Sequence, residues 1–291
     1  MAAARALILL LMVAVGAMAA EARAAPIAVV AAENFYGNVA RQIGGAHVRV
    51  TSVLANPNED PHLFAASPSA ARAVAAARIV VYNGIGYDSW MVRLLAGSPS
   101  AGRGTIEVAR LMHRKPGDNP HLWYDPETMP RYAMALAALL ERDDPAHRAD
   151  YQRNLAAFQA SLVPLDTKIA TMRTKYHGVA VTATEPVFGY MASALLLNMR
   201  DRRFQLAVMN GTEPGASDLA HFETDLRQHR VRVLLYNDQT EEALTSKMKT
   251  IANAAGIPVV GVSETEPAGK GYQTWMMDQL SALDAALMRS R

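Results

Sequence analysis

The chain has 291 residues, with 29 basic and 27 acidic side chains, and it contains no cysteine. This balance of charge gives no reason to expect nucleic acid or an anionic membrane surface as a partner. Without cysteine these residues offer no disulfide, no thiolate ligand and no residue for a lipid anchor, so a metal site must use nitrogen and oxygen donors.

The N-terminal residues have a composition of their own. Arg5 precedes an apolar run over residues 6–20, and alanines at A-x-A spacing follow. This pattern predicts a secretory signal peptide over residues 1–25, cleaved near Ala24 or Ala25. The apolar run is shorter than the roughly 20 residues that a membrane-spanning helix needs. We therefore expect a soluble protein that is exported to the periplasm.

Strand and helix patterns then alternate along the first half of the chain. The expected strands cover residues 27–32, 47–54, 78–83 and 104–109, and the expected helices cover residues 34–43, 67–77, 90–95 and 126–141. This alternation predicts βα units around a mainly parallel sheet.

One long helical stretch follows from Pro145 to Lys175, with no glycine and with apolar residues three and four positions apart. A helix of about 30 residues would be roughly 45 Å long. We interpret it as a rigid strut that joins two lobes, and a packed core helix is the alternative. Pro164 is expected to kink it, because proline removes a backbone donor.

Alternation then resumes to the end of the chain. The expected strands cover residues 178–185, 202–210, 232–237 and 258–262, and the expected helices cover residues 186–197, 216–228, 241–255 and 272–288. The predicted organisation is an N-terminal α/β lobe over residues 26–144, a linking helix over residues 145–176 and a C-terminal α/β lobe over residues 177–291.

Four segments carry a candidate metal ligand at or after the end of an expected strand. His62 lies in "NPNEDPHLF", His121 in "NPHLWYDPET", Glu185 directly after the strand at 178–184, and Glu264 after "PVVGV". Ligands of open α/β sheets bind outside the carboxyl ends of the strands. Two imidazoles and two carboxylates would make a four-coordinate site for a divalent cation between the lobes.

Two acidic residues near these histidines are candidates for orienting the rings, since ligand histidines commonly contact an outer carboxylate. They are Asp60, before His62, and Asp125, after His121. Each candidate also has an ordinary alternative. A loop histidine is usually solvated, and Glu185 could be an acid in the first turn of a helix.

The order of these segments resembles the metal-binding subunits of ABC importers for zinc and manganese, the cluster A-I (cluster 9) solute-binding proteins. The resemblance runs through "NPNEDPHLF", "RIVVYNGIGYDSWM", "NPHLWYDPE", "TEPVFGYMASAL" and "SETEPAGKGYQTWMMDQL". It implies metal ligands at His62, His121 and Glu185. The fourth is implied at Glu264, with Glu266 as the competitor. It also implies two lobes joined by a long helix, limited lobe movement, and delivery of one divalent ion to a membrane permease.

The resemblance leaves the metal open between manganese and zinc. Residues 63–120 hold only His113, so the histidine-rich loop common in zinc importers is absent, and the third ligand is the glutamate of manganese-type members. Zinc nevertheless binds most such sites more tightly. Two other classes are alternatives. A periplasmic metal-dependent hydrolase could use the same ligands, whereas a binding protein for an organic solute would need arginine and aromatic clusters in place of these acids and imidazoles. The chain has no H-E-x-x-H, G-x-S-x-G or P-loop motif. We expect a monomer without enzymatic activity.

Overall fold

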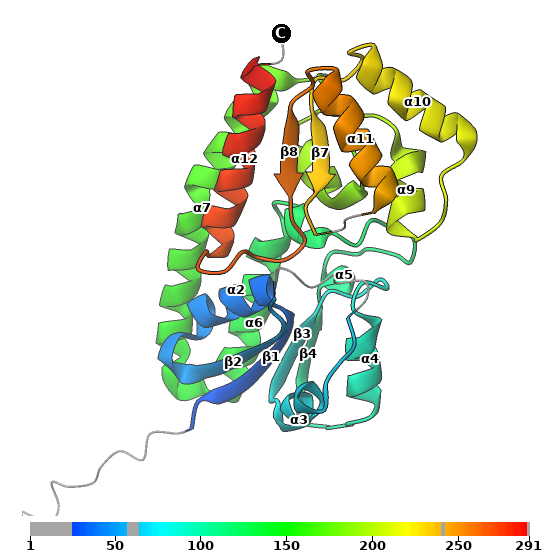
Figure 1. Cartoon of the computed structure of the whole chain (residues 1–291). Coiled ribbons are helices and arrows are strands. Elements are labelled where there is room, and N and C mark those ends of the chain that lie inside the picture. Colours follow the sequence, from blue (N-terminus) through cyan, green and yellow to red (C-terminus); the bar gives the residue numbers. More distant parts are fainter. Residues whose placement is uncertain (1–24, 57–63, 240–241, 290–291) are drawn as a thin grey trace, which may run out of the picture.

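The structure is a computed structural model that describes residues 25–56, 64–239 and 242–289 (Figure 1). The predicted signal peptide, apart from Ala25, lies outside the described residues. In the described part of the chain, none of the helices has the length and apolar character that crossing a bilayer requires.

Two sheets of four parallel strands form the framework, and both have the same strand order. The first sheet has the order β2-β1-β3-β4, built from β1 (Ile27–Glu33), β2 (Val48–Leu54), β3 (Ile79–Tyr82) and β4 (Gly104–Glu107). The second has the order β6-β5-β7-β8, built from β5 (Ala180–Ala183), β6 (Asn198–Met199), β7 (Leu234–Asn237) and β8 (Val259–Val262). This confirms the predicted α/β fold of two parallel-sheet lobes.

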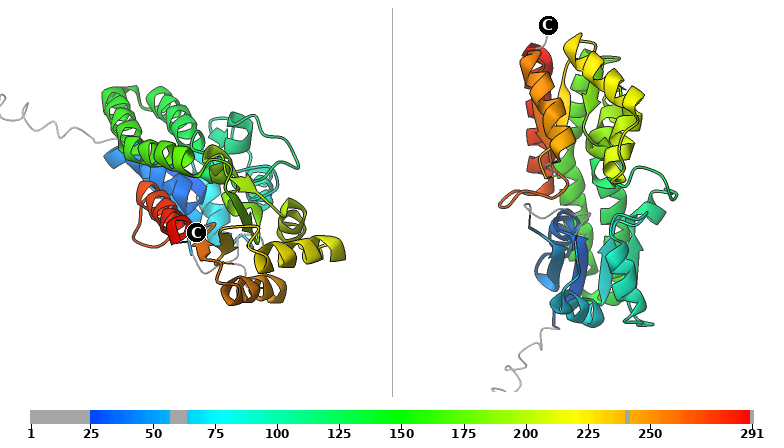
Figure 2. Two further views of the ribbon diagram at one scale, coloured as in Figure 1. Left: turned by 90° about the horizontal axis from the view of Figure 1, so that it is seen from above. Right: turned by 45° about the vertical axis from the view of Figure 1, so that its right-hand side comes forward.

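Helices cover both faces of each sheet (Figures 1 and 2). Those of the N-terminal lobe are α2 (Asn34–Gly44), α3 (Pro68–Ala76), α4 (Ser89–Ala96), α5 (Val108–Leu111) and α6 (Thr128–Asp143). Those of the C-terminal lobe are α8 (Gly189–Ala194), α9 (Arg202–Met209), α10 (Ala216–Arg227), α11 (Ala243–Ala254) and α12 (Tyr272–Arg289). Neighbouring residues of β1 point to opposite faces, so Val29 packs in the cluster that contains α2 and α6, whereas Val30 packs with α3 and α4.

One predicted strand is wrong. Residues 202–210 lie mostly in helix α9, and the strand at this place is the two-residue β6 before it. Phe204 and Val208, four residues apart, face the core, and the Phe204 ring packs edge-on against Phe222 with centroids 4.5 Å apart. The intervening Leu206 is 42% exposed.

The long helix α7 (Arg148–Tyr176) has 29 residues and runs along both lobes (Figure 1). It continues without interruption through Pro164, which lies on the exposed side. Its buried face belongs to the same large core as both sheets. The helix is therefore both a strut between lobes and a packed core element. The lobe boundaries at residues 144 and 177 stay a prediction.

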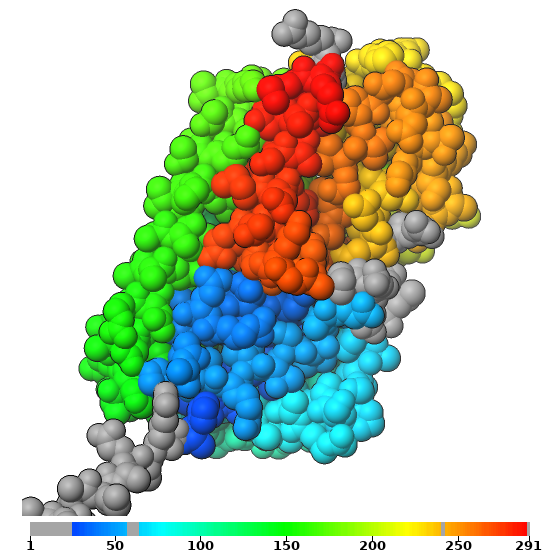
Figure 3. Space-filling model, turned by 60° about the vertical axis from the view of Figure 1, so that its left-hand side comes forward, coloured from blue at the N-terminus to red at the C-terminus, as the bar shows by residue number. Residues whose placement is uncertain are grey.

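Aromatic side chains from both lobes pack directly against one another. The Phe35 ring of α2 lies 4.6 Å from Trp123 and 6.0 Å from Trp275 of α12, and Tyr124 lies 5.2 Å from Phe188, measured between ring centroids. Figure 3 shows α12 (red) and the segment before it (orange) resting on the surface around α2 (blue).

Hydrogen bonds across the same interface join the lobes further. The hydroxyl of Tyr124 donates to the Ser263 carbonyl at 2.8 Å, and the hydroxyl of Tyr272 donates to the Trp123 carbonyl at 2.9 Å. Ser263 directly precedes Glu264, and Trp123 and Tyr124 follow His121 by two and three residues. Buried contacts of this kind favour small lobe movements and a site whose parts are already in place.

Asp284 of α12 holds that helix to α7, and its replacement gives a test of this packing. Burial by itself would raise the pKa of Asp284, but hydrogen bonds from Lys168, Tyr176 and Lys175 lower it to about 2. A lowered pKa means that the carboxylate stabilises the fold above its unfolded pKa near 4, and that this contribution disappears as the pH falls through about 2. We expect Asp284→Asn to lower the free energy of unfolding by about 1 kcal/mol at pH 7, after allowing for solvent screening.

Urea unfolding at pH 7, 5 and 3 measures this effect, with Asp278→Asn as the matched control. Asp278 also accepts from a lysine, Lys270 at 2.6 Å, but its side chain is 51% exposed, so its replacement should cost little. The Asp284 difference should be equal at pH 7 and 5 and smaller at pH 3. An unchanged difference at pH 3 would show that the ionised carboxylate is not the source of the stabilisation.

Candidate metal centre

The site lies where both sheets reverse their strand order. The first strand of each sheet, β1 or β5, has the second strand on one side and the third strand on the other. Loops after such neighbouring strands diverge and leave a place for a ligand. In Figure 1 the arrows of β7 and β8 point toward the N-terminal lobe. The candidate ligands of the C-terminal lobe therefore lie on the side of that lobe that faces the N-terminal lobe.

His121 and Glu264, from different lobes, are in direct contact. The Nε2 atom of His121 lies 3.3 Å from the Oε2 atom of Glu264, and both side chains are 0% exposed. Zinc–ligand bonds of about 2.0–2.1 Å in tetrahedral geometry place two ligand atoms ~3.4 Å apart. The observed separation therefore suits two atoms that share one ion.

Glu185 reaches the same place through Asn237, the last residue of β7. The Asn237 Nδ2 group donates to Glu185 Oε1 at 3.0 Å and to Glu264 Oε1 at 2.7 Å. Glu185, two positions after β5, is 3% exposed. The amide thus holds two carboxylates side by side, and the other oxygen of Glu264 faces His121. The structure brings together three of the four predicted ligands.

The fourth predicted ligand, His62, and the predicted orienting residue Asp60 lie outside the described residues. Their roles stay predictions.

Asn119, rather than the predicted Asp125, contacts the Nδ1 atom of His121. The Asn119 Oδ1 atom lies 2.6 Å from this nitrogen, and it also accepts from the His121 backbone N–H at 3.1 Å. Asp125 forms an ion pair with Arg114 at 2.8 Å. Since an amide oxygen can only accept, Nδ1 of His121 donates to Asn119, and Nε2 is the ring nitrogen that faces Glu264.

Asn119 also joins the two lobes. Its Nδ2 group donates to the Pro186 carbonyl at 2.7 Å, next to Glu185, and its own carbonyl accepts from the Tyr190 hydroxyl at 2.8 Å. One side chain therefore sets the distance between the His121 loop and the Glu185 loop.

Of the two acids in the loop after β8, Glu264 is the one that contacts His121. The Gln239 Oε1 atom accepts from the Thr265 backbone N–H at 2.8 Å, and Asn34 contacts the Glu266 backbone at both its N–H and its carbonyl. These contacts direct Glu264 toward His121. Glu266 is buried at 4% exposure, and burial raises its pKa to about 8 despite the opposing effect of Arg41.

Two further buried acids belong to this region and were not predicted as part of it. Glu33 ends β1, and Asp88 follows β3; each is 1% exposed. Burial, followed by the neighbouring Asp88 carboxylate, raises the pKa of Glu33 well above its usual value. Burial raises the pKa of Asp88 to about 6, against backbone hydrogen bonds from Gly84 and Asn83.

Tyr87 lies between this acid pair and the predicted ligands. Burial raises the pKa of its hydroxyl, and the next contributions come from the charges of Glu264 and Glu33. One sequence signal could have revealed Glu33 and Asn237, namely a polar residue at the carboxyl end of a buried strand. Tyr87 and Asp88 carry no such signal, because they reach the site through the turn at Gly84, where φ is 85°.

Known proteins resemble this chain over most of its length. The profile of the family described as zinc-uptake complex component A, periplasmic, matches residues 29–286. The metal ABC transporter substrate-binding lipoprotein ScbA of Streptococcus cristatus is 23% identical, over 98% of this chain and 99% of its own. The high-affinity zinc uptake system protein ZnuA of Bacillus subtilis is 28% identical, over 59% of this chain and 54% of its own.

Solved structures show the same fold. The periplasmic zinc-binding protein TroA of Treponema pallidum superposes with a TM-score of 0.76 at 17% identity, covering 90% of this chain and 99% of its own. The profile match spans both sheets and every segment that carries a candidate ligand. The chain therefore belongs to the family of the periplasmic component A of zinc-uptake complexes.

Proposed function

We propose that this protein is the solute-binding subunit of an ABC importer, which captures one divalent transition metal ion outside the cytoplasm and delivers it to a membrane permease. A single observation carries the proposal. Five acidic side chains are buried around the lobe interface, while no lysine or arginine within the described ranges is fully buried. The acids are Glu33, Asp88, Glu185, Glu264 and Glu266.

Uncompensated buried carboxylates are costly, because each charge loses its hydration. Protonation relieves the cost for some of them, as the raised pKa of Glu33 indicates. Glu185 and Glu264 instead share one amide, and Glu264 contacts an imidazole, which together make a set of donors for a cation. A bound divalent ion would balance their charge and use their geometry.

The proposed ligands are His62, His121, Glu185 and Glu264. Two nitrogen and two oxygen donors suit manganese or zinc, and relatives are named for each metal. With oxygen supplying half of the donors, we infer that manganese is accepted and that zinc competes for the same site.

Further properties follow from membership of a family of solute-binding proteins. We infer a binding role rather than a catalytic one, and a monomer that docks on its permease. The relative ScbA is named a lipoprotein, whereas the present sequence contains no cysteine to carry a lipid. We therefore propose a protein released into the periplasm after cleavage near Ala24 or Ala25.

Metal removal tests the proposal. Chelated protein should melt at a lower temperature and recover on addition of Mn²⁺ or Zn²⁺, because an ion that binds only the folded state stabilises it. At 1,000 times its dissociation constant an ion contributes about 4 kcal/mol. Elemental analysis of natively purified protein and thermal unfolding with each ion give the measurement, and Mg²⁺ serves as the control ion.

Absence of any melting shift with either transition metal would count decisively against the proposal. Turnover of an ester, phosphate or peptide that disappears in Glu264→Gln would favour a hydrolase instead. A small organic molecule retained by metal-free protein through dialysis would favour an organic solute.

A further inference from the structure

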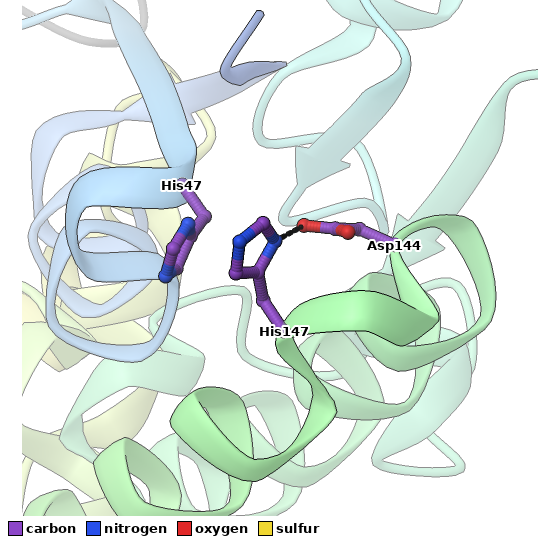
Figure 4. Close-up of side chains that lie close together, drawn as sticks. All are labelled: His47, Asp144 and His147. Atoms are coloured by element: carbon purple, nitrogen blue, oxygen red, sulfur yellow. Dashed lines mark hydrogen bonds and ion pairs between the residues drawn. The ribbon is translucent and has the colours of Figure 1, made fainter. Parts of the chain in front are cut away.

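A second group of metal-ligating side chains lies at the opposite end of the N-terminal lobe from the candidate metal centre. His47 directly precedes β2, whose other end, Leu54, leads toward the loop of His62. Seven residues of strand separate those ends by about 23 Å. Asp144 and His147 come from the turn between α6 and α7 (Figure 4).

The two imidazole rings of this group are stacked. Their centroids are 3.8 Å apart and their planes differ by 23°. A ligand atom from each of His47, His147 and Asp144 lies within 4.8 Å of the others. The side chains are 16%, 33% and 19% exposed, respectively, so an ion could enter without unfolding the lobe.

One nitrogen of each imidazole contacts a carboxylate, and the two carboxylates belong to different residues. The Nε2 atom of His47 lies 2.8 Å from Asp150 Oδ2, and the Nδ1 atom of His147 lies 2.7 Å from Asp144 Oδ2. Tyr151 donates to the same Asp144 oxygen at 2.7 Å. Histidines that bind metals commonly donate their second ring nitrogen to a carboxylate in this way. The opposite nitrogens, Nδ1 of His47 and Nε2 of His147, keep a lone pair for an ion.

We propose that His47 and His147 form a second metal site, which takes a nitrogen-preferring ion such as Zn²⁺ or Cu²⁺ and not Mn²⁺. Asp144 is a positioning residue that holds the ring of His147. The two imidazoles supply two nitrogen donors, and water supplies the remaining ligands, as it does in open zinc sites. The order of affinities for such donors places Mn²⁺ lowest and Cu²⁺ highest. Asp150 is a positioning residue that holds the ring of His47.

The geometry also sets the expected affinity. Stacked rings direct their nitrogen lone pairs nearly parallel, whereas a tetrahedral ion needs ligand atoms ~3.4 Å apart on converging lines. One imidazole must rotate out of the stack before both can bind. The second site should therefore bind Zn²⁺ at least 10-fold more weakly than the site of Glu264.

Zinc stoichiometry tests this inference independently of the proposed function. The protein for this experiment should begin at Ala25, and its affinity tag should be placed at the C-terminus and then removed. An N-terminal tag would lie close to the proposed site, because Ala25 and Pro26 line the 240 Å³ pocket beside His47 and His147. Equilibrium dialysis against Zn²⁺, followed by elemental analysis, should give two ions per wild-type chain. His47→Ala and His147→Ala should each give one, and dialysis against Mn²⁺ should give one for all three proteins.

Two controls separate the outcomes. His177→Ala removes an exposed imidazole at the other end of α7 and should keep both zinc ions. Glu264→Gln should lose the tight ion and keep the weaker one. Co²⁺ absorption should report tetrahedral coordination at the second site and lose that signal in His147→Ala.

One zinc ion per wild-type chain, unchanged in His47→Ala and His147→Ala, would overturn the second site and leave the proposed function intact. One ion that is lost in His47→Ala and kept in Glu264→Gln would overturn the proposed function and support the second site. Variants that melt at a lower temperature with an unchanged zinc count would show that the stack has only a packing role.

Discussion

Glu264→Gln is expected to remove most of the thermal stabilisation that Mn²⁺ or Zn²⁺ gives to the wild-type protein. The change keeps the size of the side chain but replaces the carboxylate that faces His121 Nε2 at 3.3 Å with a weaker donor. We expect affinity to fall at least 100-fold, which corresponds to about 2.7 kcal/mol. Thermal unfolding with and without each ion, together with a competition titration against a chelating dye, measures this loss.

The direction in which Glu264→Gln changes the melting temperature of the metal-free protein distinguishes a metal ligand from a structural residue. Removing one negative charge from a buried group of acids should leave the melting temperature of the metal-free protein unchanged or raise it. A residue needed only for packing would instead destabilise both forms equally.

Glu266→Gln is the matched control, with the same substitution two residues away in the same buried loop. Because Glu264 is the residue that contacts His121, Glu266→Gln should retain affinity within a few-fold. The reverse result, with affinity lost in Glu266→Gln and kept in Glu264→Gln, would assign the fourth ligand to Glu266.

Asn237→Asp is expected to be the most destabilising single change for metal-free protein. The Nδ2 group of Asn237 donates to both Glu185 and Glu264, and aspartate would replace this donor with a third carboxylate. We expect a loss of about 3–5 kcal/mol at pH 7, the range typical of an uncompensated buried charge. Saturating Mn²⁺ should recover part of the loss, because the ion then balances the extra charge.

The pH dependence of this loss follows from the direction of the pKa shift. An acid buried among other acids has a folded pKa above its unfolded value, as Asp88 does at about 6. Such a group destabilises the fold above its unfolded pKa, and the penalty decreases as protons bind at lower pH. Urea unfolding of metal-free Asn237→Asp should therefore show a smaller deficit at pH 5 than at pH 7.

Asn198→Asp is the control for the chemistry of this substitution, because Asn198 is an exposed residue of β6 in the same sheet. It should change stability by less than about 0.5 kcal/mol. A deficit of Asn237→Asp that is constant with pH and insensitive to metal would argue against a charge-balanced ion at the lobe interface.

The error at residues 202–210 illustrates the limit of a local pattern. Phe204, Leu206 and Val208 alternate as in a strand, yet Phe204 and Val208 alone also fit one face of a helix. The residues that pack against this segment decide between strand and helix. The ring of Phe222 in α10 packs against Phe204, whereas Leu206 is exposed. A short apolar run therefore has no secondary structure of its own until its neighbours are in place.

By itself the sequence determined the elements with long periodic patterns and the candidate ligands at their ends. The strands that contain Val29 and Leu234 are runs of apolar residues that only burial explains, and acids after such strands mark the edge where ligands bind. The sequence could not determine that Asn119 rather than Asp125 contacts His121, or that Asn237 joins Glu185 to Glu264. Those pairings join residues through space, and they exist only because the two sheets present their carboxyl ends to the same interface. Hydrophobic patterning acts locally along the chain, whereas the balance of buried charge depends on which side chains the packed lobes bring within a few ångströms.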